Sequence, residues 1–188
     1  TQQTKCDRKI GLVGSELCKR ARKETVEVLG RKGSGRSTML KTLVGLVPPT
    51  SGSILLDRKE LAGAPPYQIV RHGIAYVPEE RLVFDHLTVE ENLIIGMQPG
   101  VSGAPAWSTE DMFGYFPRLR ERRSTLAGQL SGGEQQMLTL CRSLLCHPRI
   151  ILLDEPTVAL APTIVERLVA VMRAIAAPRA GVPDQPLT

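Results

Sequence analysis

The sequence predicts an α/β fold in which a core of short apolar strands and amphipathic helices is interrupted by a helical insertion. Two apolar segments, residues 25–29 and 150–153, read as core strands, and each is followed by signals for a turn and then a helix. Between them, residues 85–146 have mainly helical periodicity and contain two helix-capping patterns. With 188 residues, 42% of them hydrophobic, the chain is long enough to bury one substantial core.

The individual elements follow from the spacing of apolar residues. After the strand at 25–29, a helix is expected up to Pro48, because apolar residues recur at three- and four-residue intervals from Met39 onward. Thr88 and Ser131 each stand three residues before a glutamate, the spacing of a capping box, so each predicts a helix start. Further strands are expected at 51–56, 74–77 and 150–153, and further helices at 110–116 and 164–172.

These elements predict one folded domain. We expect an irregular N-terminal segment over 1–24, an α/β domain over 25–177 and a tail over 178–188. The domain is expected to consist of a core, 25–84 and 147–177, and a helical insertion at about 85–146. The sequence ends where another core strand is expected, which predicts a core truncated at its C-terminus.

The composition excludes several classes of function. The net charge of +5 is spread along the chain without interleaved aromatic residues, so no nucleic-acid partner is expected. The four cysteines lack the spacing of a metal site and are expected to be reduced thiols. Apolar runs are shorter than the ~20 residues that cross a bilayer, and residues 1–5 lack the apolar core of a signal peptide. Any membrane association is therefore expected to depend on a partner.

A glycine-rich stretch over residues 30–38 connects the first expected strand to the first helix, the order that a phosphate-binding loop requires. Glycines allow backbone amides to curl around phosphate oxygens, and the helix N-terminus adds its dipole. The pattern G-x-x-x-x-G-K-[ST] requires lysine where Arg36 stands, and a planar guanidinium does not replace a compact ammonium. The nucleotide-binding residues expected here are Gly30, Gly33, Ser34, Gly35, Arg36, Ser37 and Thr38, and the Ser37 hydroxyl is also expected to bind Mg²⁺.

Two adjacent carboxylates, Asp154 and Glu155, follow the strand at 150–153. Carboxylates at the end of a buried strand are costly unless they have a function. Asp154 is suited to Mg²⁺ binding through the outer coordination shell of the ion, and Glu155 is placed to act as the general base that polarises an attacking water. A helix cap is the alternative for such a pair, but its position downstream of a glycine-rich loop favours phosphate chemistry.

Residues 130–135, Leu-Ser-Gly-Gly-Glu-Gln, resemble the signature sequence of the ATP-binding-cassette (ABC) ATPases. The glycine-rich loop before them and the acidic strand end after them stand in that family's order, and the resemblance runs from about Thr25 to Met172. It implies a P-loop NTPase core, Mg²⁺-dependent ATP hydrolysis and a head-to-tail dimer. In such a dimer the signature residues of one subunit cap ATP held by the other: here Ser131, Gly132, Gly133 and Gln135.

Four further segments, residues 77–84, 87–93, 116–119 and 160–162, resemble the ATP-binding subunit of importers for branched-chain amino acids, whose relatives serve urea or short-chain amides. In this resemblance Glu79 takes the place of a glutamine that contacts Mg²⁺. The resemblance implies membrane permease subunits and a second ATP-binding subunit as partners. It also implies a peripheral location at the cytoplasmic face of the inner membrane.

Several departures from the family pattern leave an alternative open. Glu27 lies inside an expected core strand, Arg58 occupies a turn that favours glycine, and no aromatic residue before Tyr67 is available to stack on adenine. Together with Arg36, they are compatible with a truncated, catalytically impaired cassette remnant that binds nucleotide weakly or not at all. A cassette acting in DNA repair or translation would be expected to carry long insertions or a tandem second cassette, and this sequence has neither.

Overall fold

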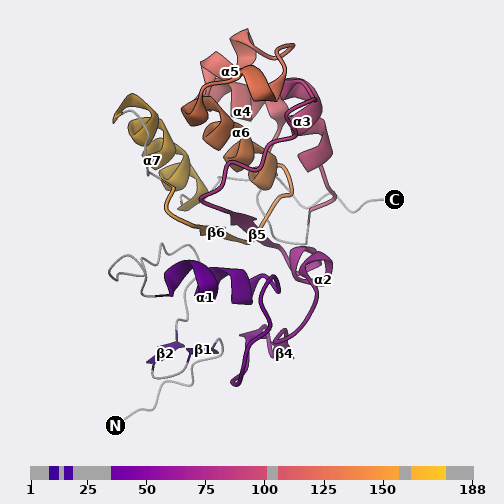
Figure 1. The fold of residues 1–188 in the computed structure, drawn as a ribbon, viewed down its shortest axis with the longest axis vertical. Helices are drawn as coiled ribbons and strands as arrows, with labels where there is room; N and C mark the ends of the chain where they lie inside the picture. The colour runs from indigo at the N-terminus through magenta and orange to yellow at the C-terminus, as the bar shows by residue number, and fades with distance from the viewer. Residues whose placement is uncertain (1–8, 13–14, 19–34, 101–105, 157–161, 177–188) are drawn as a thin grey trace.

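The structure is a computed structural model that describes residues 9–12, 15–18, 35–100, 106–156 and 162–176. Its elements lie in two groups, one around α1 and one around α6, with β5 and β6 between them (Figure 1). In chain order the elements are β1 (Lys9–Leu12), β2 (Ser15–Cys18), α1 (Arg36–Leu43), β3 (Leu55–Leu56), β4 (Lys59–Glu60), α2 (Pro66–Arg71), β5 (Ile74–Val77), α3 (Val89–Gly96), α4 (Thr109–Tyr115), α5 (Pro117–Glu121), a 3₁₀ turn η1 (Ala127–Gln129), α6 (Gly132–Leu144), β6 (Ile150–Leu153) and α7 (Pro162–Ala176).

The strands β5 and β6, both predicted from the sequence, pair in parallel with Ile74 opposite Ile150 and Val77 opposite Leu153. Because side chains alternate along a strand, β6 contributes to both sides of this pair. Ile150 and Leu152 pack against the cluster that includes α1 and α2, whereas Ile151 and Leu153 pack against the helical cluster around α6. The strand pair therefore separates the two cores.

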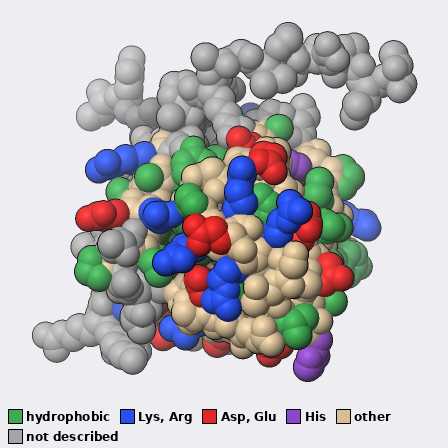
Figure 2. All heavy atoms as spheres, turned by 90° about the horizontal axis from the view of Figure 1, so that it is seen from above, with side chains coloured by type: hydrophobic (Ala, Val, Ile, Leu, Met, Phe, Trp, Pro, Cys, Tyr) green, Lys and Arg blue, Asp and Glu red, His purple; other side chains and the backbone are tan. Residues whose placement is uncertain are grey.

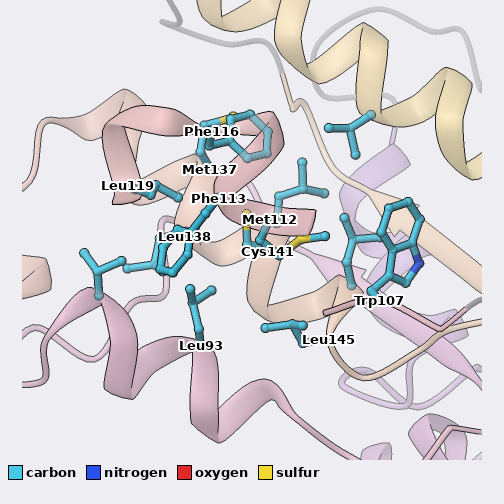
Figure 3. Packing of buried hydrophobic residues seen from close by; sticks show 14 of the residues in the cluster. Leu93, Trp107, Met112, Phe113, Phe116, Leu119, Met137, Leu138, Cys141 and Leu145 are labelled. Atoms are coloured by element: carbon cyan, nitrogen blue, oxygen red, sulfur yellow. The ribbon is translucent and has the colours of Figure 1, made fainter. Parts of the chain in front are cut away.

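The larger core lies among the helices that follow β5 (Figure 3). Its centre is fully buried, as the zero exposure of Met112 on α4 and Leu138 on α6 indicates. The capping boxes predicted at Thr88 and Ser131 are present, and each begins the helix that the sequence predicted. The residues labelled in Figure 3 are Leu93, Trp107, Met112, Phe113, Phe116, Leu119, Met137, Leu138, Cys141 and Leu145.

Helix α1 ends at Leu43, so the prediction that it extends to Pro48 is wrong. Gly45 adopts φ 75°, and the amides of Gly45 and Leu46 donate to the carbonyls of Thr42 and Lys41 at 3.1 and 2.8 Å. This is a Schellman motif, which satisfies the last carbonyls of the helix. A Cβ at position 45 would also lie 2.3 Å from the carbonyl oxygen of Ala64, so glycine is required there on two grounds.

The segment 1–24, predicted to be irregular, contains the antiparallel pair of β1 and β2. Each of these strands has four residues, too few for a period-two pattern to stand out among polar neighbours. The helices α2 and α5 were also missed, because six and five residues are too few for a helical repeat of apolar residues to be recognised. The predicted strand 25–29 with Glu27 lies outside the described residues, and the domain limits stay a prediction.

Arg58 adopts φ 67° and Asp57 φ 50° in the turn between β3 and β4. The sequence predicted that this turn favours positive φ and therefore glycine. The prediction of the backbone conformation is confirmed, although arginine occupies the position.

Helices α3 and α6 approach each other closely at Gly96. Gly96→Ala should lower the free energy of unfolding by about 1–3 kcal/mol, the usual cost of overpacking. A Cβ at this position would lie 2.5 Å from the Arg142 carbonyl oxygen and 3.0 Å from its Cα, and a backbone clash cannot be relieved by a change of rotamer. Urea denaturation measures the effect.

Gly114→Ala on α4 is the matched control, because among the described residues no atom beyond its chain neighbours and its own helix backbone lies within 4 Å of the added Cβ. This variant should be neutral or more stable by up to about 1 kcal/mol, the difference in helix propensity. Equal denaturation midpoints for the two variants would contradict a close contact between α3 and α6.

Candidate active site

The N-terminus of α1 has the backbone geometry of an anion-binding helix end. Gly35 precedes the helix with φ 84°, a conformation that favours glycine, and accepts a hydrogen bond from the Met39 amide at 2.9 Å. Among the described residues no side chain caps this end. The amides of the next residues, Arg36, Ser37 and Thr38, belong to the first turn and have no partner within the helix. Of the other residues predicted to bind nucleotide here, Gly30, Gly33 and Ser34 lie outside the described residues.

Asp154 lies directly after β6 and is only 2% exposed. Its carboxylate accepts two hydrogen bonds, from the Ser37 hydroxyl to Oδ1 at 2.9 Å and from the Tyr76 hydroxyl to Oδ2 at 3.0 Å. Its own amide donates to the Val77 carbonyl at 2.9 Å, which continues the pairing of β6 with β5. The structure therefore brings two predicted metal ligands, Ser37 and Asp154, into direct contact although 117 residues separate them.

Glu155 forms an ion pair with Arg36, with Oε1 2.5 Å from Nη2. Both side chains are partly exposed, at 29% and 32%, so water screens the pair and its net contribution to stability is small. Glu155 adopts φ 45°, an uncommon conformation for a residue other than glycine. The ion pair thus places Glu155, the predicted general base, against Arg36, which stands where the phosphate-binding motif has lysine.

Glu79, the third predicted metal ligand, lies in the exposed segment after β5. Burial raises the pKa of the Tyr76 hydroxyl, and the hydrogen bond to Asp154 together with the charges of Asp154, Glu80 and Glu79 raises it further. Neighbouring Glu80 accepts from Lys41 Nζ at 3.1 Å, which ties this segment to α1. The structure thus shows no direct contact of Glu79 with Ser37 or Asp154, although its charge acts on the Tyr76 hydroxyl that binds Asp154.

The residues at this site fit Mg²⁺. Among the described residues no group of three or more His, Cys, Asp and Glu side chains forms a metal centre. Magnesium does not need one, because it is usually held by one or two carboxylates, water and the phosphates of the substrate. Ser37 and Asp154 offer the hard oxygen atoms that this ion prefers, next to a helix N-terminus suited to phosphate.

The signature residues form the N-terminus of α6. The Ser131 hydroxyl accepts from the Glu134 amide at 3.4 Å and donates to Oε2 of Glu134 at 2.8 Å. Glu134 also accepts from the Ser131 amide at 2.8 Å and from Arg122 Nη1 at 3.1 Å. Burial raises the pKa of Glu134, but these hydrogen bonds and the Arg122 charge outweigh it, and the net pKa is lowered. A carboxylate thus stabilises the start of this helix.

Two contacts at the signature were not predicted. Gln135, expected to bind nucleotide, donates from Nε2 to the Ala127 carbonyl at 3.1 Å, so within one subunit it supports the preceding turn. The guanidinium of Arg81 lies on Gly132, where a Cβ would be 2.1 Å from Arg81 Nη1. Gly133 follows on the half-buried first turn. Among the described residues no hydrogen bond or ion pair joins these groups to Ser37, Asp154 or Glu155.

The basic run near α5 is largely paired with acidic residues. Arg118 pairs with Glu121 at 3.0 Å, Arg120 pairs with Glu110 on α4, and Arg122 pairs with Glu134. Figure 2 shows basic and acidic side chains interspersed on the face at the helical end of the molecule. This mixed surface lacks the continuous positive stripe that is typical of a nucleic-acid interface.

Comparison with known proteins gives the family. The sequence profile of the ABC transporter family matches residues 18–158. The chain is 45% identical over 145 residues to the high-affinity branched-chain amino acid transport ATP-binding protein BraG of Pseudomonas aeruginosa, covering 77% of this chain and 62% of that protein. It is 40% identical over 139 residues to the probable branched-chain amino acid transport ATP-binding protein LivF of Archaeoglobus fulgidus, covering 74% of this chain and 59% of that protein. The chain thus spans about three fifths of the length of these relatives.

Solved structures give the same fold. An ATP-binding subunit of an ABC transporter superimposes with a TM-score of 0.65 and 26% identity, covering 90% of this chain and 72% of that one. A dimeric ATP-binding cassette bound to ADP and Pi superimposes with a TM-score of 0.69 and 24% identity, covering 90% and 79%. No helix among the described residues is long and apolar enough to cross a membrane. The predicted P-loop NTPase fold is confirmed, and the chain belongs to the ABC transporter family of ATP-binding proteins.

Proposed function

We propose that this chain is the ATP-binding and ATP-hydrolysing subunit of an importer for branched-chain amino acids or related small polar solutes. The hydrogen bond between Ser37 and Asp154 carries the proposal, because it joins the N-terminus of α1 to the carboxyl end of β6. Ligands of α/β sheets bind at this edge, where helix N-termini and strand ends meet. The names of the two branched-chain relatives support the solute class.

Nucleotide binding rests on the first turn of α1. The amides of Arg36, Ser37 and Thr38 lie where they attract phosphate oxygens, and the helix dipole adds to that attraction. Mg²⁺ held by Ser37 and Asp154 would neutralise phosphate charge, which is the main electrostatic requirement of phosphoryl transfer. Glu79 is proposed as a further oxygen ligand, reached when its exposed segment moves toward the nucleotide.

Hydrolysis is assigned to Glu155. Its carboxylate accepts a proton from the attacking water and so activates it as a nucleophile. The ion pair with Arg36 at 2.5 Å opposes this role, because the same carboxylate oxygen is engaged by a guanidinium. A phosphate group on the loop offers Arg36 a second anion and would draw it away from Glu155. We therefore propose an active ATPase that Arg36 slows.

A second ATP-binding subunit completes the proposed site. Ser131 is exposed, and Gly132 and Gly133 present backbone amides at the positive end of α6. These groups are available to an anion held by another subunit, and the dimeric cassette bound to ADP and Pi has the same fold. The alternative of a truncated, catalytically impaired remnant that binds nucleotide weakly or not at all is not favoured, since both branched-chain relatives are transport ATP-binding proteins.

Membrane permease subunits are the second proposed partner, with this chain at the cytoplasmic face of the inner membrane. Large apolar side chains are exposed on α3 and on the segment before it, and Asn92 of α3 joins the two by hydrogen bonds to the Phe84 backbone at 2.9 and 3.1 Å. An exposed apolar surface of this kind marks an interaction site. The exposed side chains are Leu82 and Phe84 before α3, Ile94 and Ile95 on α3, and Met97 directly after it, at 59%, 47%, 57%, 46% and 52%.

Glu155→Gln should reduce Mg²⁺-dependent ATP turnover by at least about 100-fold, the usual contribution of a general base. The amide keeps the size of the side chain but cannot take up the proton of water. ATP binding, measured by fluorescence with a labelled nucleotide, should remain. Turnover that survives the substitution would contradict the assignment of Glu155, and an unmodified protein that binds no Mg²⁺-nucleotide would contradict the proposed function as a whole.

Arg36→Lys should raise the kcat of ATP hydrolysis by about tenfold, equivalent to about 1.4 kcal/mol in the barrier. The compact ammonium bridges phosphates better and releases Glu155 from its planar, two-pronged partner. Steady-state phosphate release measures the effect, and Arg118→Lys on the surface of α5 is the control. An unchanged or lower kcat in Arg36→Lys would show that the ion pair does not limit hydrolysis.

Ile94→Glu should abolish leucine uptake by a transporter assembled with branched-chain permease subunits, because a charge would be buried in the proposed interface. ATP turnover of the isolated subunit should not change, since Ile94 is 57% exposed. Val70→Glu on α2, at a position 46% exposed, serves as the control. Normal uptake with Ile94→Glu would place the permease contact elsewhere.

A further inference from the structure

Tyr76 is a contact of Asp154 that phosphate chemistry by itself does not require. Its hydroxyl donates to Asp154 Oδ2 at 3.0 Å, while Ser37 donates to the other oxygen, Oδ1, at 2.9 Å. We propose that Tyr76 is a positioning residue that fixes the Asp154 carboxylate for the Mg²⁺-nucleotide. This inference rests on the proposed function, because it assigns Tyr76 to the same metal site.

The strand register explains why a tyrosine reaches this carboxylate. Tyr76 lies opposite Leu152 in the parallel pair, so Asp154 is two residues further along the chain, directly after β6. Two residues of a strand advance ~6.6 Å. Only a long side chain that leans along the strand covers this distance, and the tyrosine side chain is long enough. The next residue of β5, Val77, accepts the Asp154 amide at 2.9 Å. One strand therefore holds both the backbone and the side chain of Asp154.

The two hydrogen-bond donors to Asp154, Ser37 and Tyr76, have different roles. Ser37 is on the helix that receives the phosphates, and its hydroxyl is itself a candidate ligand of the ion. Tyr76 is half-buried on a strand and binds the oxygen that Ser37 does not. With only one anchor, the carboxylate is free to turn about its Cβ–Cγ bond, and a buried oxygen loses its partner. Tyr76 thus keeps the ligand oriented while Ser37 adjusts to the ion.

The Tyr76 hydroxyl donates directly to the Asp154 carboxylate, at 3.0 Å from Oδ2. A group that orients a metal ligand in this way commonly affects metal affinity ten- to hundredfold. A tyrosine that only satisfies its own hydroxyl in the core would leave metal affinity unchanged, which makes the two roles distinguishable.

The test is Tyr76→Phe, which removes the hydroxyl and keeps the ring. Binding of Mn²⁺ to the complex with a non-hydrolysable ATP analogue, measured by electron paramagnetic resonance, should weaken by at least about tenfold. Binding of the analogue without metal should be unchanged. Tyr67→Phe is the matched control, because Tyr67 lies on α2 and is 60% exposed. Equal Mn²⁺ affinities in the two variants would overturn the inference.

A measurement on the unmodified protein covers the case in which Tyr76→Phe does not fold. With tyrosine labelled at ¹³Cζ, the chain gives only three signals, from Tyr67, Tyr76 and Tyr115. Adding Mg²⁺ to the nucleotide complex should shift the Tyr76 signal and leave the Tyr67 signal in place. An unmoved Tyr76 signal in a protein that binds Mg²⁺-nucleotide would refute the positioning role alone. If the unmodified protein binds no Mg²⁺-nucleotide, the proposed function fails as well.

Discussion

The buried carboxylate of Asp154 is the constraint on which the rest of the site depends. A charge that is 2% exposed is tolerated only when polar groups surround it. Here the donors come from two elements far apart in the sequence, Ser37 on α1 and Tyr76 on β5. Satisfying one carboxylate therefore fixes the N-terminus of α1 against the ends of β5 and β6. That junction is the place where the dipole of α1 meets the proposed metal ligand and the proposed general base.

The two cores on either side of the strand pair hold this junction in position. The smaller core anchors α1 through Leu43, and the larger one anchors the end of β5 through Val77. The charged segment that follows β5 contacts both groups of helices. Glu80 pairs with Lys41 on α1, and the Arg81 guanidinium lies against Gly132 of α6. The proposed phosphate site and the signature helix are thus linked through one short segment, which also contains Glu79.

Local patterns in the sequence predict much of this arrangement. The capping boxes at Thr88 and Ser131 and the strand β6 depend on neighbours within a few residues, and they were predicted correctly. The roles of the acidic pair after β6 stay a prediction. The hydrogen bond of Tyr76 to Asp154 and the pairing of Arg36 with Glu155 span 78 residues or more of the chain, and no local pattern predicts them. Gly45 was missed because its requirement comes from the approach of Ala64 and from the end of α1 rather than from apolar spacing.

The central claim, that Ser37 and Asp154 hold the magnesium of a bound nucleotide, is tested most directly by thermal denaturation of the whole chain. We expect ATP with Mg²⁺ at about 100 times its Kd to raise the Tm by about 5–10 °C, because a ligand that binds only the folded state stabilises it by mass action. ATP with EDTA should give a clearly smaller rise. Equal Tm values with and without Mg²⁺ in the presence of ATP would contradict the claim.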